Sequence, residues 1–142
     1  MKNQFVANKK VAMNAPVAKV WKAITDPAQI KVYFFGTDVH TDWKKGSPLT
    51  YTGVWEGKQY EDKGVIVDIV PEKLYHSTYY SPLSGLEDKP ENYNNVIWEL
   101  SEENGKTTVS LTQDNIPTEE SRQHSEKNWE MVLNNMKNLI EK

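Results

Sequence analysis

The chain has 142 residues, 37% of them hydrophobic, with a formal net charge of −3 and no cysteine. One domain of this length buries about two-thirds of the surface of its unfolded chain. The lack of cysteine excludes disulfides, thiolate nucleophiles and cysteine-ligated metal sites. The negative charge argues against nucleic-acid binding, which needs a positive patch.

No apolar run in the sequence is long enough to span a bilayer, and the first residues lack the continuous apolar core of a signal peptide. We therefore expect a soluble protein of the cytoplasm, without membrane insertion. Aromatic residues make up 11% of the chain. This content is typical of a packed core and also of a pocket that holds a flat apolar ligand.

The N-terminal part is predicted to form one strand followed by two short helices. Residues 3–13 have the pattern of a strand, and Pro16 opens a helix, where its missing N–H costs nothing. Asp26 is a suitable N-cap for the second helix, with Pro27 at its first position and Gly36 at its end. The apolar positions of the first helix recur at helical spacing and are Val17, Val20, Trp21 and Ile24.

From residue 38 onward the apolar period changes to two, which predicts six further strands. Short turns between them, such as Glu56-Gly57 and Asn104-Gly105, predict an antiparallel meander. The positions that share a phase within each strand are Val39, Thr41 and Trp43; Leu49, Tyr51, Gly53 and Trp55; Val65, Val67 and Ile69; Val96, Trp98 and Leu100; and Val109, Leu111 and Gln113.

The strand 74–80 leaves two registers open. His76 and Tyr80 are in phase with Leu74 and would point inward, whereas a bulge would turn the alternate set inward instead. That alternate set is Tyr75, Ser77 and Tyr79. The segment 81–95 that follows is rich in Pro, Asn and charge and has no period. It is either a flap beside a pocket mouth or a connection without a role.

The C-terminal part is predicted to be one long helix, which Thr118 can cap. Its apolar stripe repeats at helical spacing and consists of Trp129, Val132, Leu133, Met136 and Ile140. The order of elements predicts an α+β fold in a single domain, 1–142. A curved antiparallel sheet of six to seven strands would wrap around the long helix, with two short helices after the first strand.

These residues also carry a family likeness. The stretch 15–27 resembles the Ala-Pro-x-x-x-Val-Trp-x-Ala-Leu-Thr-Asp-Pro opening of the START-like, or SRPBCC, superfamily, in the branch of the activator of Hsp90 ATPase homologue 1. Residues 43–47, 63–74 and 108–113 support the likeness. The tail 129–137 is similar to the pattern Trp-x-x-x-Leu-x-x-Leu-Lys, with Met136 in place of the last leucine.

The resemblance implies the helix-grip fold, in which the sheet grips the C-terminal helix around a cavity. Members of the superfamily bind lipids, sterols, hormones, polyketides and flavonoids, and some are cyclases. The eukaryotic namesake of the branch binds Hsp90 and stimulates its ATPase, and only its C-terminal domain resembles this chain. The resemblance therefore implies either a small hydrophobic ligand or an Hsp90-type chaperone as partner.

Between the sheet and the long helix we expect a ligand site lined by aromatic rings and a few polar groups. A core filled by side chains is the alternative. The positions expected to line the site are Trp43, Tyr51, Trp55, His76, Tyr80, Trp98, Gln113, Trp129, Leu133 and Met136.

No catalytic or metal-binding constellation stands out. Asp62 and Asp68 fall out of phase with Val65 and Val67, so we expect both carboxylates to be exposed. The three histidines are scattered and do not predict a metal site, and no cofactor is expected. We therefore expect a monomeric binding protein that performs no chemistry. A chaperone-associated interaction module and a cyclase- or hydrolase-like enzyme are the alternatives.

Overall fold

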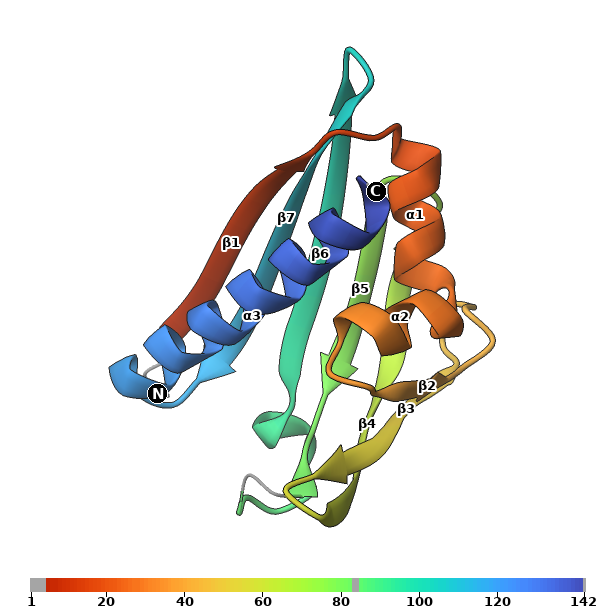
Figure 1. Cartoon of the computed structure of the whole chain (residues 1–142). Helices are drawn as coiled ribbons and strands as arrows, with labels where there is room; N and C mark the ends of the chain where they lie inside the picture. The colour runs from red at the N-terminus through yellow and green to blue at the C-terminus, as the bar shows by residue number, and fades with distance from the viewer. Residues whose placement is uncertain (1–4, 83–84, 142) are drawn as a thin grey trace.

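The fold was obtained as a computed structural model, which describes residues 5–82 and 85–141 with the exception of the Trp55 side chain. The chain forms one seven-stranded antiparallel sheet and three α-helices (Figure 1). Its elements in chain order are β1 (Phe5–Met13), α1 (Val17–Thr25), α2 (Pro27–Tyr33), β2 (Asp38–His40), β3 (Pro48–Trp55), β4 (Lys58–Val70), β5 (Leu74–Tyr79), the 3₁₀ turn η2 (Pro90–Asn92), β6 (Asn94–Glu103), β7 (Lys106–Ile116) and α3 (Glu119–Ile140).

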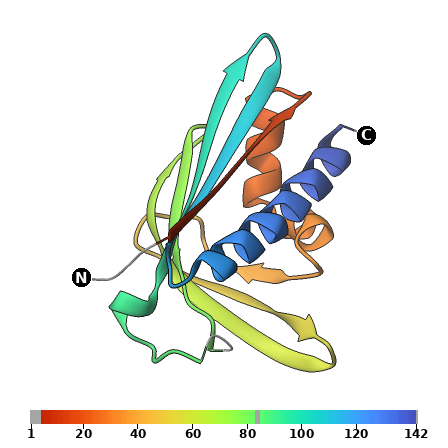
Figure 2. The ribbon, with the colours of Figure 1, turned by 90° about the vertical axis from the view of Figure 1, so that its left-hand side faces the viewer.

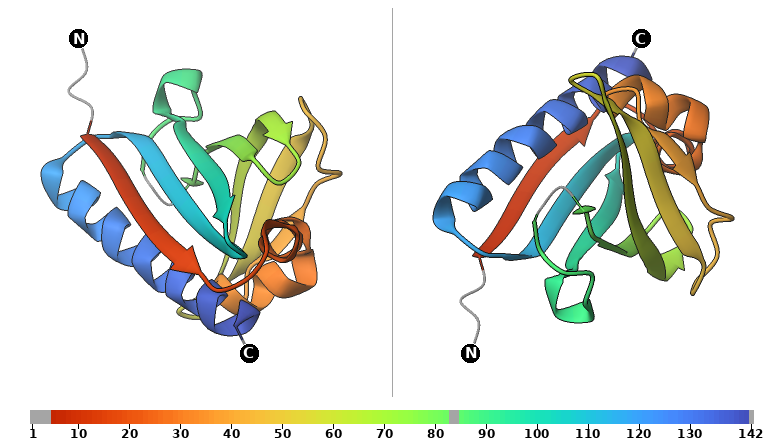
Figure 3. Two further views of the ribbon diagram at one scale, coloured as in Figure 1. Left: turned by 90° about the horizontal axis from the view of Figure 1, so that it is seen from above. Right: turned by 90° about the horizontal axis from the view of Figure 1, so that it is seen from below.

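The strands lie in the order β1-β7-β6-β5-β4-β3-β2, so every sequential pair from β2 to β7 is adjacent and β1 closes on β7. The three α-helices cover the same face of the curved sheet, which we call the inner face (Figures 2 and 3). Helix α3 packs chiefly against β1 and next against α2. The α+β fold predicted from the sequence is confirmed. No helix in the described part of the chain combines the length and apolarity needed to cross a membrane.

The helix starts depend on local capping contacts. The Asp26 side chain accepts a hydrogen bond from the backbone N–H of Ala28 (3.0 Å), with Pro27 at the first helical position. Thr118 accepts from Ser121 N–H (3.0 Å) and so caps α3. Both caps agree with the sequence prediction, because each satisfies an amide that the helix itself leaves unpaired.

The phase of β4 differs from the expectation. Val65 and Val67 were expected inside but are 42% and 38% exposed, whereas Ile66 is fully buried and Asp62 is only 8% exposed. The pairing with β5 shifts between Ile66 and Asp68, which marks a β-bulge. Because the bulge inserts an extra residue, Ile69 returns to the inner face, opposite Tyr75, as the sequence predicted.

The register of β5 is the alternate one. Tyr75 and Ser77 are 5% and 1% exposed, and Tyr75 pairs with Trp98, which lies under α3. The prediction that His76 points inward is wrong, because successive side chains of a strand alternate between faces. His76 lies on the outer face, where its Nε2 and Oδ1 of Asn95 form a hydrogen bond of 2.9 Å.

The described residues between β5 and β6 lie at one end of the sheet, on the side turned away from the helices (Figures 2 and 3). Tyr80 lies under this segment, stacks on Tyr93 and donates a hydrogen bond to the carbonyl of Leu86 (2.6 Å). Lys63 of the neighbouring strand β4 forms an ion pair with Asp88 of this segment. The inward position predicted for Tyr80 is therefore wrong, because its ring packs under this segment and not beneath α3.

Gly64 in β4 allows a close approach of two strands. A Cβ at this position would overlap the backbone carbonyl of Thr78, which cannot move without disturbing β5. We expect Gly64→Ala to lower the free energy of unfolding by about 2 kcal/mol. Gly53→Ala is the matched control, because its Cβ would meet only the tip of the Tyr60 ring, and we expect a smaller loss. Urea denaturation followed by circular dichroism measures both, and equal losses would contradict the backbone explanation.

Candidate functional site

The inner face of β3, β4 and β5 carries a group of aromatic side chains beside a carboxylate. We call this group the aromatic site. It lies where α2 and the first half of α3 face the sheet, and its members are Phe34, Tyr51, Asp62, Tyr79 and Trp129. The four aromatic residues are half-buried.

Ring contacts connect the site from α3 to β5. The Trp129 ring meets Phe34 edge-on with centroids 5.7 Å apart, and Phe34 stacks on Tyr51 at 6.3 Å. Tyr51 in turn lies 6.0 Å from Tyr79. Trp129 also contacts Trp98 of β6 at 6.2 Å. Such offset and edge-on pairs are the favoured geometries of aromatic rings.

The polar atoms of the site are bonded to one another. The Tyr79 hydroxyl donates to Oδ2 of Asp62 at 2.6 Å. The side chains of Tyr75 and Ser77 lie close enough to the Tyr51 hydroxyl to influence its pKa. Burial raises the pKa of Tyr79, and the neighbouring Asp62 charge adds to the rise. Burial likewise raises the pKa of Tyr51 and of Tyr75.

Asp62 is the exception among these groups. Its Oδ1 is buried and has no hydrogen-bond partner among the described residues. Asp62 lies opposite Tyr51 in the β3–β4 pairing, so both project from the same face of the sheet. The expectation that Asp62 is exposed is therefore wrong. A buried carboxylate oxygen without a donor is unusual, because its desolvation is not compensated.

Four predicted site residues come together on the inner face. Tyr51 and Trp129 belong to the aromatic site, and Trp98 is 5% exposed beside it. Gln113 of β7 accepts a hydrogen bond from the Trp129 indole N–H at 2.7 Å, which fixes the orientation of that ring. Whether these four contact a ligand stays a prediction.

The remaining predicted residues lie elsewhere. Leu133 and Met136 are fully buried in the core beneath α3, where they belong to the packed cluster. Trp43 packs edge-on against Tyr75 at 5.7 Å, toward the α1 end of the sheet. The side chain of Trp55 lies outside the described residues. His76 and Tyr80 lie away from the site, as described above.

Sequence reasoning missed Asp62 and Phe34, and it placed Tyr79 only in the alternate register. Asp62 shares its phase with Gly64 and Ile66. The apolar Ile66 was the one signal in the sequence that could have placed this set of residues, Asp62 included, on the inner face. Phe34 falls inside the second helix as predicted, which was expected to end at Gly36, but it in fact follows the last residue of α2 and reaches across to β3.

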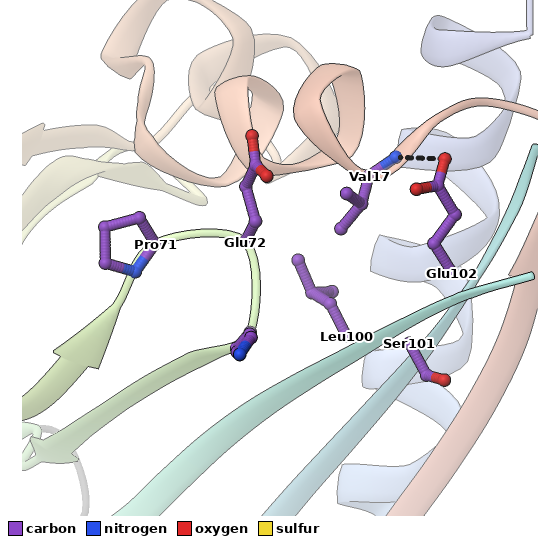
Figure 4. A pocket seen from close by; sticks show the side chains of 7 residues that line it. Val17, Pro71, Glu72, Leu100, Ser101 and Glu102 are labelled. Atoms are coloured by element: carbon purple, nitrogen blue, oxygen red, sulfur yellow. Dashed lines mark hydrogen bonds between the residues drawn. The ribbon is translucent and has the colours of Figure 1, made fainter.

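Two surface hollows open beside α1, at the other end of the sheet. One, of about 450 Å³, is lined by Val17, the turn Pro71-Glu72-Lys73 and the end of β6 (Figure 4). There Oε2 of Glu102 accepts a hydrogen bond from Val17 N–H (3.2 Å) at the start of α1. The other, of about 520 Å³, lies between Trp21 and Trp43. Neither hollow lies beneath Leu133 and Met136, where the sequence placed the ligand.

The charged groups of the described chain do not form a metal site, since no three of its His, Asp and Glu side chains gather closely enough to hold an ion. His76 belongs to a network on the outer face. Asn95 donates from Nδ2 to Oδ2 of Asp114 (3.0 Å) and from its backbone N–H to Oδ1 (2.6 Å). These contacts give His76 a structural hydrogen bond at the junction of β5, β6 and β7.

Comparisons with known proteins agree with the fold. The family described as Activator of Hsp90 ATPase homolog 1-like protein matches residues 14–141. ChR145 from Cytophaga hutchinsonii is 42% identical, with a TM-score of 0.87 over 99% of this chain and 97% of its own. CalU16 from Micromonospora echinospora (22% identity, TM-score 0.71, 97% and 85% covered) and the Aha1 dimer from Colwellia psychrerythraea (16%, 0.75, 96% and 96%) share the fold. No curated protein sequence matches the chain.

The buried tyrosines of α2 and of the inner face predict a loss of stability in alkali. Burial raises the pKa of Tyr33, Tyr51, Tyr75 and Tyr79 in the folded state, whereas an unfolded tyrosine ionises near pH 10. The unfolded chain therefore loses protons that the folded chain keeps. This contribution to stability is fully present below about pH 10 and is lost above it.

For Tyr33 and Tyr75 alone, which are 2% and 5% exposed, we expect a loss of about 3 kcal/mol per pH unit above pH 10. Tyrosinate absorbance should rise in one step together with the loss of circular dichroism. Tyr33→Phe should make the decline of stability with pH less steep. Ionisation of all seven tyrosines before any change in circular dichroism would contradict this prediction.

Proposed function

The chain belongs to the Activator of Hsp90 ATPase homolog 1-like family, and on that premise we propose that it binds a small, flat and largely apolar molecule at the aromatic site. The molecule is bound without a chemical step. The observation that carries the proposal is the continuous set of half-buried rings from Trp129 through Phe34 and Tyr51 to Tyr79.

Half-buried rings favour binding because their remaining exposed faces can be covered by a ligand. A ligand ring that stacks on a side-chain ring buries apolar area, and the two rings also have a favoured relative orientation. Polar groups at the same place would fix the orientation of the ligand, as is typical of small-molecule sites. Gln113 supports this arrangement, since its bond to the indole of Trp129 holds that ring in place before a ligand arrives.

Of the ligand classes suggested by the superfamily, the flat ones suit this lining best. A polyketide or flavonoid presents a planar face to rings that lie about 6 Å apart, among which Phe34 and Tyr51 are stacked. Leu133 and Met136 are fully buried in the packed core, so the proposed site lies beside Trp129 and not beneath the second half of α3. The monomeric state and the cytoplasmic location expected from the sequence stay predictions.

The neutral probe 2-naphthalenemethanol tests the proposal. In a titration of the labelled protein we expect saturable shifts of the Trp129 indole signal and of amides at Phe34 and Tyr51 in nitrogen–proton NMR spectra. A ligand of this size should bind with a dissociation constant of about 1 mM or tighter.

Two variants of β5 form a matched pair. Tyr79→Leu removes a ring of the site and should weaken binding about fivefold, since an aromatic contact contributes about 1 kcal/mol. His76→Leu changes the outer face of the same strand and should leave the affinity unchanged. The absence of saturable shifts, or equal weakening by both variants, would refute the proposed function.

Binding of an Hsp90-type chaperone is a second candidate, favoured by the family description and by apolar side chains on the outer face. Val54, Val65 and Val67 are 62%, 42% and 38% exposed on β3 and β4. This function predicts a raised ATPase rate of an added Hsp90-type chaperone. Val65→Ser combined with Val67→Ser should abolish that increase, whereas Tyr79→Leu should preserve it. An ATPase rate that does not respond to the protein would exclude this candidate.

A further inference from the structure

Asp62 is a buried carboxylate with one oxygen unused. Its side chain projects from the inner face of β4, opposite Tyr51, and the residue is 8% exposed. Oδ2 accepts a hydrogen bond from the hydroxyl of Tyr79, whereas the buried Oδ1 has no hydrogen-bond partner among the described residues. A single neutral hydroxyl satisfies only part of what a carboxylate can accept, since its two oxygens offer about four acceptor sites.

No cation of the described chain compensates this charge. Lys63, the next residue, points to the outer face and forms its ion pair with Asp88. None of the ion pairs found among residues 5–82 and 85–141 includes Asp62. Buried charges in proteins are normally paired, because the desolvation of an isolated ion is costly. The missing partner of Asp62 is therefore expected from outside the described residues.

The surroundings of Asp62 suit a positive partner. The rings of Tyr51 and Tyr79 lie 6.0 Å apart beside it, and Phe34 stacks on Tyr51. The face of an aromatic ring carries negative charge density and attracts a cation. A buried carboxylate among aromatic rings is an environment that suits an ammonium group.

We propose that the ligand of the aromatic site carries a protonated amine, whose N–H donates to Oδ1 of Asp62 while its flat body lies against Tyr51, Phe34 and Trp129. This inference rests on the proposed function and narrows its ligand class. A neutral hydroxyl would supply a hydrogen bond and leave the charge of Asp62 without a counterion. An acidic ligand such as a fatty acid would place two negative charges side by side and is disfavoured.

A matched pair of probes distinguishes the contribution of the ligand's charge to affinity from that of its aromatic ring. 2-Naphthylmethylamine and 2-naphthalenemethanol share the same aromatic body and differ in the group that would reach Asp62. We expect the wild-type protein to bind the amine at least tenfold more tightly than the alcohol, measured by NMR titration at neutral pH. Asp62→Asn keeps the size of the side chain and removes its charge. In that variant the amine should bind no more tightly than the alcohol.

Two further variants control for indirect effects. Asp68→Asn removes a carboxylate from the same strand beyond the bulge, opposite His76 on the outer face, and should preserve the preference for the amine. Tyr79→Phe removes the hydroxyl that bonds Asp62 and retains both the ring and the charge, so it should preserve the preference as well. A thermal melt of each variant verifies that it is folded.

The outcomes distinguish this inference from the proposed function. If both probes bind the wild type with equal affinity and Asp62→Asn leaves their ratio unchanged, the amine inference is overturned and the site remains a binding site for flat molecules. If Asp68→Asn abolishes the preference as fully as Asp62→Asn does, the preference reflects overall charge and the inference is overturned. If neither probe binds, the proposed function falls, and this inference falls with it.

Discussion

The ring of Phe34 connects the long helix α3 to strand β3 of the sheet. It contacts Trp129 of α3 on one side and Tyr51 of β3 on the other, although the strand that α3 itself chiefly packs on is β1, at the far edge of the sheet. Its position depends on how α2 ends: Phe35 adopts a left-handed backbone (φ 55°), and Gly36 N–H bonds back to the carbonyl of Lys31. The helix end therefore places Phe34 where it closes the gap between helix and sheet.

Because rings close this gap, the polar atoms behind them are removed from water. On the outer face, His76, Asn95 and Asp114 satisfy one another through short hydrogen bonds. On the inner face, Asp62 keeps one oxygen without a donor. A core selected for stability alone would hold a leucine or an asparagine at such a position, since a half-satisfied buried carboxylate is costly. The contrast between the two faces is the reason that we propose a binding site on the inner one.

The sequence predicted the parts of the fold that carry strong local signals. The caps at Asp26 and Thr118 and the stripe from Val132 to Ile140 gave the helices correctly, because each rests on a pattern within one element. The phase of β4 was wrong, because Val65 and Val67 have the apolar character of core residues and nothing local reveals the bulge after Ile66. A period of two has only two phases, so one wrong choice moved Asp62 to the opposite face.

Membership of the family indicates the fold more firmly than the function, because fold and function depend on different residues. Buried positions such as Val20, Leu133 and Met136 need only an apolar side chain of suitable volume, and similar cores form from many sequences. Structures only 16% to 22% identical therefore keep the fold. Asp62 and Tyr79 are different, because the bond between them requires these chemical groups and stabilises no helix. Under the proposed function, the choice of ligand depends on such positions, which can change while the core remains.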